Sequence, residues 1–513
     1  MNKALSIMLT ALIAVLTVSC AKNSGSAEPF SLTSSNGKFS GSDNVYTITS
    51  AGVYSLSGSL EGRIVVDAGD KADVYLELYG VTISSSKDSP IKIISADSVE
   101  ITAKNGSANY INDTRSVKKS DDASQGEGAI YAKSDVILKG SGSLIINASY
   151  NNGIHTTKDL KIQKLTLEVT AYDNAIKGND SITIASGTVT AISTHGDGMK
   201  TKNTDVSKKG IVRGDITLSG GNVTVYAAGD GFQAAHNFEM TSSNGSSGAT
   251  VTVYTGSYSE YTASDARTTS YKGVKSQNEL NIRGGSLTIH SYDDGLHSDA
   301  ENQAISISGG TITIGVNSPT GKTAGDGRQF WSGQRSVSGA DGIHADGILS
   351  ISGGSVMIDS AYEGLEANVI NISGGKTYVS ANDDGVNACK GASTPQINVT
   401  GGYLDVAVPP DGDTDGIDSN GSYSQSGGVV ITRGPDIQMA AAMDASGRIQ
   451  ITGGTLIILG YGRASTGDDI KTYSLSLHSA GDQTVSIGGK TYTFTNSTAY
   501  ARTKCYSDTE VSQ

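Results

Sequence analysis

The sequence predicts an all-β fold: a right-handed, single-stranded parallel β-helix (solenoid) with a cap at each end. The first observation is a recurring motif, an acidic or amide turn followed by Gly or Ala, one aliphatic residue and one polar residue, as in Asp294-Gly-Leu-His297. An alternating strand, a Gly-Gly corner and a second alternating strand then follow, as in 305–314. Uninterrupted copies lie 21 to 23 residues apart, which is typical of a solenoid whose turns add strands to parallel sheets.

Composition is the third observation. Gly accounts for 65 of 513 residues and Pro for only 7, which suits a fold rich in tight corners and ladder hydrogen bonds. The formal net charge is −13 and no basic patch is present, so we exclude a nucleic-acid partner. The repeats predict one elongated body, which we expect to be a monomer.

Residues 1–19 are predicted to be a lipoprotein signal peptide. Lys3 precedes an apolar run that is too short to span a membrane, and Leu16-Thr-Val-Ser-Cys20 follows it. Cleavage before Cys20 and acylation of its thiol would attach the protein to the bacterial cell envelope, at the outer membrane or cell surface. An ordinary signal-peptidase site with an incidental cysteine is the alternative. Residues 20–44 are rich in Ser, Gly and Asn and are interpreted as a tether.

The remaining chain divides into a cap, a repeat region and a second cap. Residues 45–127 contain short strands without the acidic turn, so we predict an N-terminal cap and first coils there. Residues 128–460 form the repeats, and 461–513 form the C-terminal cap. Three insertions, 203–213, 242–271 and 315–339, interrupt the repeat. Two remaining cysteines, Cys389 and Cys505, are expected to be free and buried.

Polar residues of the motif are expected to form a stripe along the solenoid. The residue after the aliphatic position points outward, and equivalent positions stack about 4.8 Å apart in a parallel solenoid. The predicted stripe is basic or neutral in its first half and acidic in its second, and comprises Tyr131, His155, Lys177, Lys200, Gln233, Lys275, His297, His344, Glu366, Asn387, Asp418 and Asp444.

The acidic half of this stripe predicts Ca²⁺ binding. Turn chemistry alone explains Asp before Gly, but not acidic residues on strands, where Asp is disfavoured. Clustered hard oxygen ligands suit Ca²⁺. The candidate ligands are Asp293, Asp294, Asp299, Asp341, Asp346, Glu363, Glu366, Asp383, Asp384, Asp415, Asp418 and Asp444.

Aromatic residues provide candidate sugar contacts. Tyr150, Tyr172, Tyr292 and Tyr362 each precede the acidic turn of their repeat. They form either a packing ladder or an aromatic strip for sugar faces. Trp331, the only Trp, lies in the third insertion, where it either contacts ligand or seals the loop against the coil.

The chain resembles a known family at this point. Gly52-Val-Tyr-Ser-Leu-Ser-Gly58, Ile64-Val-Val-Asp67 and Val74-Tyr-Leu-Glu-Leu-Tyr-Gly80, together with the later turn motifs, are similar to carbohydrate-binding β-helix proteins of cellulolytic and gut bacteria. Their fold is close to that of pectate lyases. The resemblance implies calcium-assisted, non-catalytic binding of plant-cell-wall polysaccharide such as cellulose and polygalacturonate.

Two other functions stay open. In a calcium-dependent, pectate-lyase-like enzyme, Lys177, Lys200 or Lys275 would serve as the base, although these lysines precede the repeats in which carboxylates accumulate. An adhesin or structural surface protein without a sugar ligand is the third class. We favour non-catalytic polysaccharide binding.

Overall fold

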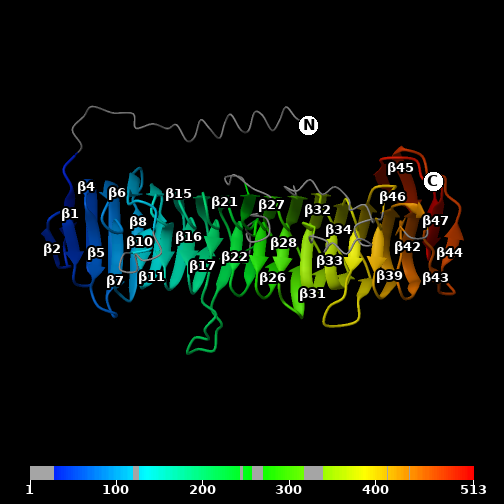
Figure 1. The fold of residues 1–513 in the computed structure, drawn as a ribbon, viewed down its shortest axis with the longest axis horizontal. Helices are drawn as coiled ribbons and strands as arrows, with labels where there is room; N and C mark the ends of the chain where they lie inside the picture. Colours follow the sequence, from blue (N-terminus) through cyan, green and yellow to red (C-terminus); the bar gives the residue numbers. More distant parts are fainter. Residues whose placement is uncertain are drawn as a thin grey trace.

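The chain folds into an elongated body built only from strands (Figure 1). This computed structural model describes residues 28–118, 126–242, 247–256, 270–316, 339–412, 414–437 and 440–513, and no helix occurs among them. The all-β prediction is therefore confirmed. The predicted signal peptide, Cys20 and Trp331 lie outside the described residues. Within those residues, no helix has the length and apolar character needed to cross a membrane.

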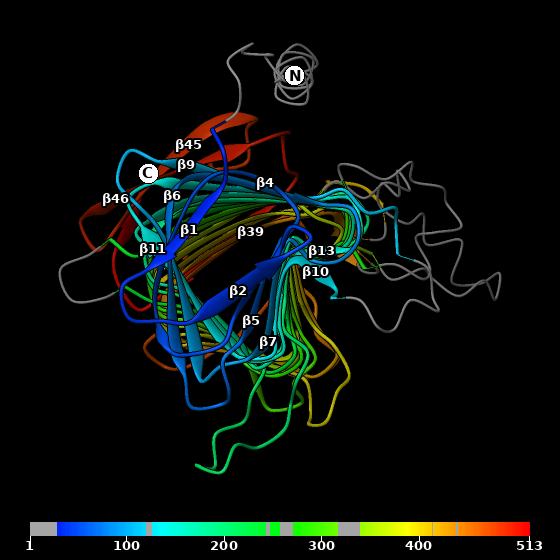
Figure 2. The same cartoon turned by 90° about the vertical axis from the view of Figure 1, so that its left-hand side faces the viewer.

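Most strands belong to one large, mostly parallel sheet that folds into three ladders. In the regular part, each strand pairs in parallel with the strand three places later, so every turn of chain adds one strand to each ladder. The end-on view shows these turns superposed (Figure 2). The period-two alternation of the sequence reappears in burial, since β12 alternates between half-buried or exposed and buried side chains.

The first ladder carries the predicted polar stripe. Its strands are β3 (Val45–Ile48), β5 (Arg63–Asp67), β7 (Ile91–Ser95), β10 (Gly128–Ala132), β13 (Asn152–Thr156), β16 (Ile176–Gly178), β19 (Met199–Lys200), β22 (Phe232–Ala234), β25 (Val274–Ser276), β28 (Leu296–Ser298), the starts of β31 (Ile343–Ile351) and β33 (Leu365–Ile372), β35 (Val386–Ala388) and β38 (Ile417–Ser419).

The second ladder follows the first around the coil. Its strands are the starts of β4 (Gly52–Glu61) and β6 (Asp73–Ser85), β8 (Ser98–Ala103), β11 (Asp135–Gly140), β14 (Asp159–Gln163), β17 (Ser181–Ile184), β20 (Asp215–Leu218), β23 (Phe238–Met240), β26 (Leu280–Ile282), β29 (Gln303–Ile307), the ends of β31 and β33, β36 (Gln396–Val399), the starts of β39 (Ser422–Arg433) and β42 (Ile449–Leu459), and β43 (Ser465–Thr466).

The third ladder closes each turn. Its strands are the ends of β4 and β6, β9 (Ala108–Asp113), β12 (Ser143–Ala148), β15 (Leu165–Ala171), β18 (Gly187–Ser193), β21 (Asn222–Ala227), β24 (Thr250–Thr255), β27 (Ser286–Ser291), β30 (Thr311–Val316), β32 (Ser355–Ser360), β34 (Lys376–Ser380), β37 (Tyr403–Ala407), and the ends of β39 and β42.

The core lies inside the coil and runs along its length. Inward Val, Ile and Leu side chains of all three ladders form one continuous apolar cluster. Glycine is required at the turn, because a Cβ on Gly295 would collide with Ile314 and the carbonyl oxygen of Gly342 in the next coil. It is also required at the corner, where Gly310 has a φ of 85°. These two contacts explain the recurring Gly positions of the motif.

Both ends are covered by antiparallel strands. β1 (Ser31–Ser34) pairs with β4, and β2 (Phe39–Ser42) pairs with β3. The prediction that all of 20–44 is a tether is therefore wrong at its C-terminal end, where these residues cover the open edge of the first coil. At the other end β47 (Thr503–Ser507) pairs antiparallel with β42, and β44 (Lys471–Tyr473) pairs with β47.

The remaining strands extend the C-terminal cap. β45 (Gly481–Ile487) pairs antiparallel with β46 (Lys490–Asn496) and β48 (Val511–Ser512), over a separate apolar cluster. The short β40 (Asp436–Ile437) and β41 (Ala440–Ala441) form a hairpin. The strand-like segment Thr250–Tyr254, expected inside the second insertion (242–271), is part of β24, a regular strand of the third ladder.

Candidate functional site

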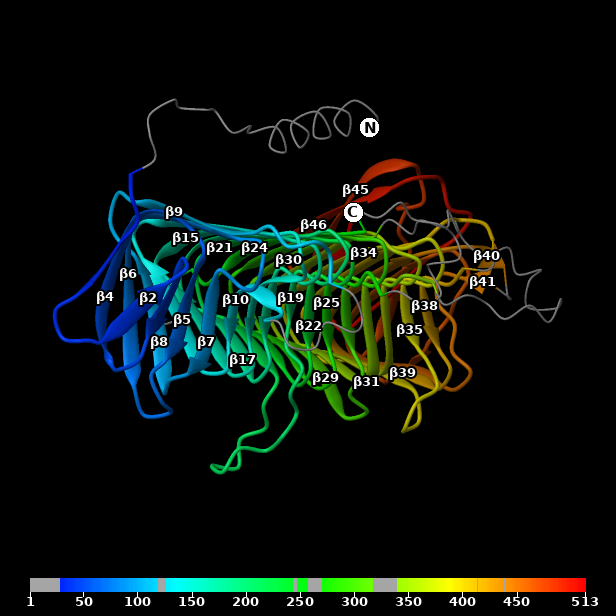
Figure 3. The same cartoon turned by 60° about the vertical axis from the view of Figure 1, so that its left-hand side comes forward.

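The outward positions of the first ladder stack in register. We define the polar ladder as the twelve residues whose Cα atoms pair strand to strand along this face, namely Lys92, Tyr131, His155, Lys177, Lys200, Gln233, Lys275, His297, His344, Glu366, Asn387 and Asp418. Figure 3 shows several of the strands that carry it side by side. The predicted stripe is thereby confirmed as a row, basic or neutral first and acidic later. Asp444 lies beyond its last strand and donates its N–H to the carbonyl of Ile417.

Most members of the polar ladder are half-buried. In β16, β22, β25 and β28 the middle residue is half-buried while its two neighbours are buried. His155 and Asn387 are less accessible still, at 4% and 8% exposure. The ladder is therefore a partly covered surface rather than a fully exposed one.

The turn carboxylates hold successive coils together. Asp197 Oδ1 accepts the backbone N–H of Asp230 at 2.9 Å, and Asp294 Oδ1 accepts that of Asp341 at 2.9 Å. Asp384 Oδ1 accepts that of Asp415 at 2.8 Å. Each bond satisfies a turn N–H that would otherwise be buried without a partner. One oxygen of these carboxylates thus has a structural role, and the other remains available for further contacts.

Lysines neutralise the carboxylates in the first half of the polar ladder. Lys200 Nζ lies 2.7 Å from Asp197. Lys272 occupies the turn position where other repeats carry Asp, and its Nζ lies 3.0 Å from Asp293 and 2.7 Å from Asp294. Burial opposes ionisation of Lys272, but these two carboxylates raise its pKa above the usual value. Sequence reasoning missed Lys272, although Lys in place of the turn Asp was a visible signal.

His155 and Lys177 form a different pair in the same half. Neither ring nitrogen of His155 makes a hydrogen bond among the described residues, and Glu127 lies 3.5 Å from Nδ1. Burial, followed by the charge of Lys177, lowers the pKa of His155 to about 4. Burial also lowers the pKa of Lys177, which makes no ion pair with any described residue. A largely neutral imidazole and a lysine without an ion-pair partner among the described residues therefore lie side by side, with Glu127 and Asp173 near the lysine.

Two stacked imidazoles mark the transition to the acidic half. The rings of His297 and His344 have centroids 4.9 Å apart and an interplanar angle of 8°. His297 contacts Asp294 Oδ2 through Nδ1 at 2.7 Å and Asp299 Oδ1 through Nε2 at 2.6 Å. Each imidazole is thus held between carboxylates rather than open to solvent.

His344 has three acidic neighbours. Its Nδ1 lies 3.0 Å from Asp341 Oδ2 and 2.9 Å from Glu366 Oε2, and its Nε2 lies 3.3 Å from Asp346. Burial opposes its protonation, but the hydrogen bonds to Asp341 and Glu366 raise the pKa of His344 to about 11. Burial likewise opposes ionisation of Glu366, yet the bond from His344 lowers the pKa of Glu366 to about 2.

The later repeats contain carboxylates without basic partners in the described part of the chain. Burial, and then the charges of Asp383 and Asp415, raise the pKa of Asp384 well above its usual value. Burial and Asp444 raise the pKa of Asp418 to about 6. These oxygen donors fit a hard cation such as Ca²⁺ in chemistry. Among the described residues, however, potential ligand atoms come together in threes, within 4.8 Å of one another, at two places. One group is Asp294, His297 and His344, and the other is Asp341, His344 and Glu366. Both groups include His344.

The predicted aromatic residues do not share one environment. The ring of Tyr150 is 1% exposed and lies under the guanidinium of Arg115, 3.7 Å from its centroid, so it offers no face to a sugar. Tyr172 stacks on His195 at 4.0 Å, and Tyr292 is 37% exposed. Tyr362 is half-buried. Tyr150 is thus corrected to a packing residue, whereas the other three stay candidates.

Sequence reasoning missed an aromatic row on the third ladder. Tyr226, Tyr254 and His290 pair in register, with centroids 5.0 and 4.9 Å apart and interplanar angles of 7° and 11°. The signal was present, because each ends the pattern Thr, Val or Ile, then aromatic residue or His. The row is flat and partly exposed.

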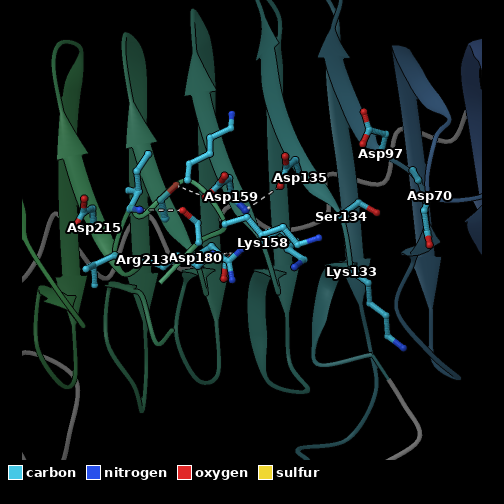
Figure 4. Close-up of a pocket in the computed structure, with 17 residues that line it drawn as sticks. Asp70, Asp97, Lys133, Ser134, Asp135, Lys158, Asp159, Asp180, Arg213 and Asp215 are labelled. Atoms are coloured by element: carbon cyan, nitrogen blue, oxygen red, sulfur yellow. Dashed lines mark hydrogen bonds and ion pairs between the residues drawn. The ribbon is translucent and has the colours of Figure 1, made fainter. Parts of the chain in front are cut away.

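A groove of about 830 Å³ lies where the first ladder turns into the second. Second-ladder strands β11, β14 and β20 place Asp135, Asp159 and Asp215 in its lining, with Ser181 of β17 between the last two (Figure 4). Arg213, from the first insertion, contacts Asp180 at 3.1 Å. The mixed charge of this groove was not predicted, because the groove is lined by residues from turns that lie far apart in the sequence.

Comparison with known proteins identifies the family. A model described as carbohydrate-binding domain-containing protein matches residues 42–327, more than half of the chain. The chain belongs to this carbohydrate-binding family. A relative with the same description from Acetivibrio thermocellus is 39% identical over 123 residues, which cover 24% of this chain and 43% of that protein. The chain thus matches less than half of that relative's length.

One solved structure is also similar. It is described as the polysaccharide lyase-like protein from C. thermocellum, gadolinium derivative, and is 32% identical. The match covers 48% of this chain and 89% of that chain, with a TM-score of 0.41. The carbohydrate-binding family, rather than this structural likeness, supports a sugar ligand.

Proposed function

We propose that the protein binds extended polysaccharide along the polar ladder, without catalysing its cleavage. The observation that carries this proposal is the uninterrupted register of twelve polar residues from Lys92 to Asp418. At about 4.8 Å per strand such a row extends about 50 Å, which suits many weak contacts with a long chain. Family membership supports carbohydrate as the ligand. In this proposal the stacked coils form a right-handed parallel β-helix.

Ca²⁺ assists binding in this proposal. Asp384, Asp418 and Asp444 would hold the ion together with Asp415, because all four supply oxygen donors. Among the described residues, Asp384, Asp418 and Asp444 make no ion pair with a basic side chain, and the charge of Asp415 acts on Asp384. Bound calcium neutralises carboxylates and can join them to those of an acidic sugar chain. Polygalacturonate binding should therefore need Ca²⁺, whereas cellulose binding should not.

The test is retention on immobilised polygalacturonate and on cellulose, with Ca²⁺ or with chelator. The double variant Asp418→Asn plus Asp444→Asn should lose calcium-dependent retention on polygalacturonate and keep cellulose binding. A matched control, Glu168→Gln plus Asp359→Asn, removes two exposed charges from the third ladder. Equal retention of both variants would exclude this calcium role, and no retention on any wall polysaccharide would favour the adhesin alternative.

A lyase is the competing function, favoured by the unpaired and half-buried Lys177. A base must lie within hydrogen-bond reach of the proton it removes. Lys177 lies four ladder steps before His297, roughly 19 Å at the usual strand spacing, and further from the later carboxylates. Assays for unsaturated uronide should therefore stay negative. Release that depends on Lys177 or Lys200 would establish a lyase instead.

Aromatic side chains contribute to cellulose binding in this proposal. Tyr254 is stacked between Tyr226 and His290, so the row presents ring edges and phenol hydroxyl groups, which can contact a sugar chain. Tyr254→Ala should weaken retention on cellulose and have little effect on the calcium-dependent retention on polygalacturonate. The aromatic residues that we predicted from the sequence are tested in the same assay by Tyr172→Ala, Tyr292→Ala, Tyr362→Ala and Trp331→Ala. Tyr150→Phe is the control at a buried position.

We also propose that Cys20 is acylated and tethers the protein to the cell envelope. The support is the apolar run followed by Leu16-Thr-Val-Ser-Cys20. Cys20→Ser should release the protein from the membrane fraction. An unchanged distribution between membrane and soluble fractions would contradict the anchor.

A further inference from the structure

Three side chains converge on one point in the acidic half of the polar ladder. Asp341 Oδ2, His344 Nδ1 and Glu366 Oε2 lie within 4.8 Å of one another. Asp341 comes from the turn before β31, His344 from β31 and Glu366 from β33, the next coil. Backbone pairing on both sides fixes these positions. The three atoms are therefore arranged in advance rather than gathered from mobile side chains.

The surroundings of this point are short of positive charge. Glu363 also lies near Asp341 and Glu366 and repels both. In the described part of the chain, His344 is the only basic side chain in ion-pair contact with any of these three carboxylates. By contrast, Asp294, one coil earlier, contacts both Lys272 and His297. The same ladder thus has a compensated cluster followed directly by an undercompensated one.

A buried amide gives a second and independent indication of a ligand. Asn387 is 8% exposed and pairs in register with Glu366. Its Nδ2 donates to Glu363 Oε2 at 2.9 Å, whereas its Oδ1 has no hydrogen-bond partner in the described part of the chain. An unsatisfied buried oxygen is costly, and a cation or its bound water would satisfy it.

We infer that Asp341, His344 and Glu366 form a binding site for a divalent transition-metal ion of the Zn²⁺ class, distinct from any calcium site. Ca²⁺ takes six to eight oxygen ligands, so an imidazole nitrogen at the centre of the site disfavours it. One His and two carboxylates suit Zn²⁺, which takes His nitrogen and carboxylate oxygen and leaves a fourth position for water. On binding, the ion replaces the protons that the three ligand atoms share, on Nδ1 and between the two carboxyl groups, and these protons leave to solvent.

The other ring nitrogen of His344 is already oriented for this role. Nε2 lies 3.3 Å from Asp346 Oδ1, and a metal-bound His usually donates its second N–H to such a carboxylate. His297 is not a comparable ligand, because Lys272 already neutralises Asp294, the carboxylate beside its Nδ1. The geometry therefore favours one ion per chain. This inference does not depend on polysaccharide binding.

The test is metal binding by the full chain after chelator treatment and dialysis. Calorimetric titration should show one Zn²⁺ bound per chain, and added Co²⁺ should give visible absorption bands typical of nitrogen and oxygen coordination. His344→Asn should lower Zn²⁺ affinity by more than about a hundredfold, since losing even an outer partner typically costs about 10- to 100-fold. It should also abolish the Co²⁺ bands and leave Ca²⁺ binding unchanged.

Two further variants complete the experiment. His195→Asn removes an exposed imidazole outside the site and should leave Zn²⁺ affinity unchanged. Asp346→Asn keeps the three ligands but weakens the orientation of His344, and should lower affinity by about tenfold. If His344→Asn does not fold, the Zn²⁺ affinity of Asp346→Asn tests the site instead. Unchanged Zn²⁺ affinity in His344→Asn or Asp346→Asn, or displacement of Zn²⁺ by equimolar Ca²⁺, would overturn the inference. These experiments measure metal binding alone, so their result holds whether or not the protein binds a glycan.

Discussion

The two halves of the polar ladder use the same backbone but balance their charges differently. In the first half, Lys200 and Lys272 lie within ion-pair distance of turn carboxylates. In the second half, Asp341 and Glu366 share the single imidazole of His344, and Glu363 makes no ion pair among the described residues. The comparison shows that one repeat can build either a self-neutralised surface or one with an excess of carboxylates. The charge balance of a coil depends on whether Lys or Asp occupies its turn.

The largest expected difference comes from removing one turn charge in each half. Asp294→Asn leaves the backbone acceptor Oδ1 in place but deprives the half-buried Lys272 and His297 of a charge partner. We expect a loss of about 3 kcal/mol in unfolding free energy, as for a broken buried ion pair. Asp341→Asn keeps the same kind of backbone bond while relieving repulsion, so its change should stay within about 1 kcal/mol.

Urea denaturation in the presence of chelator measures both variants, so that no bound cation stabilises either half. Hydrogen exchange of β28 and β31 then locates the change. Equal destabilisation by the two variants would show that the halves do not differ in charge balance.

A smaller difference should appear with pH. His155 has a pKa lowered to about 4 from 6.5, so its contribution to stability is complete above pH 6.5 and is lost as pH falls towards 4. Between pH 6.5 and 5 the loss should be roughly 2 kcal/mol. His344 acts oppositely, because its pKa is raised to about 11: its contribution is complete below pH 6.5 and is lost as pH rises towards 11.

Region-resolved hydrogen exchange, corrected for intrinsic rates, can follow β13 and β16 at pH 7 and pH 5. His155→Phe should remove the acid sensitivity of these strands while leaving the response of β31 and β33 to alkaline pH. Acid sensitivity that persists in His155→Phe would assign it to another group.

The smallest effect is expected at Lys177. It makes no ion pair among the described residues, so Lys177→Met should change the unfolding free energy by less than about 1 kcal/mol. It should nevertheless weaken retention on polygalacturonate, because an ammonium group without an ion-pair partner is free to contact an anionic chain. Thermal melting and retention assays on the same preparation separate the two effects, and Lys161→Met on an exposed position of β14 is the control. Unchanged retention would remove Lys177 from the binding surface.

Local sequence determined the fold class and the order of the polar ladder. Alternation of apolar and polar residues decides which side chains enter the core, and the repeat length places equivalent residues in neighbouring strands. His297 and His344 could therefore be expected in one row although 47 residues separate them in sequence, and their strands do pair in register. The place of each polar residue in the ladder can be predicted from its position within its own turn alone.

Tertiary structure decided what each side chain contacts. The hydrogen bond that the Asp341 N–H donates to Asp294, and the neutralisation of Asp294 by Lys272, depend on which turns become neighbours. Insertions of different lengths hide that in the sequence. The burial of Tyr150 under Arg115 is likewise invisible to periodicity. Alternation specifies only the direction of a side chain, whereas burial and charge pairing depend on atoms brought together from other coils. The physical reason is that hydrogen bonds and ion pairs act over a few ångströms in space, regardless of separation along the chain.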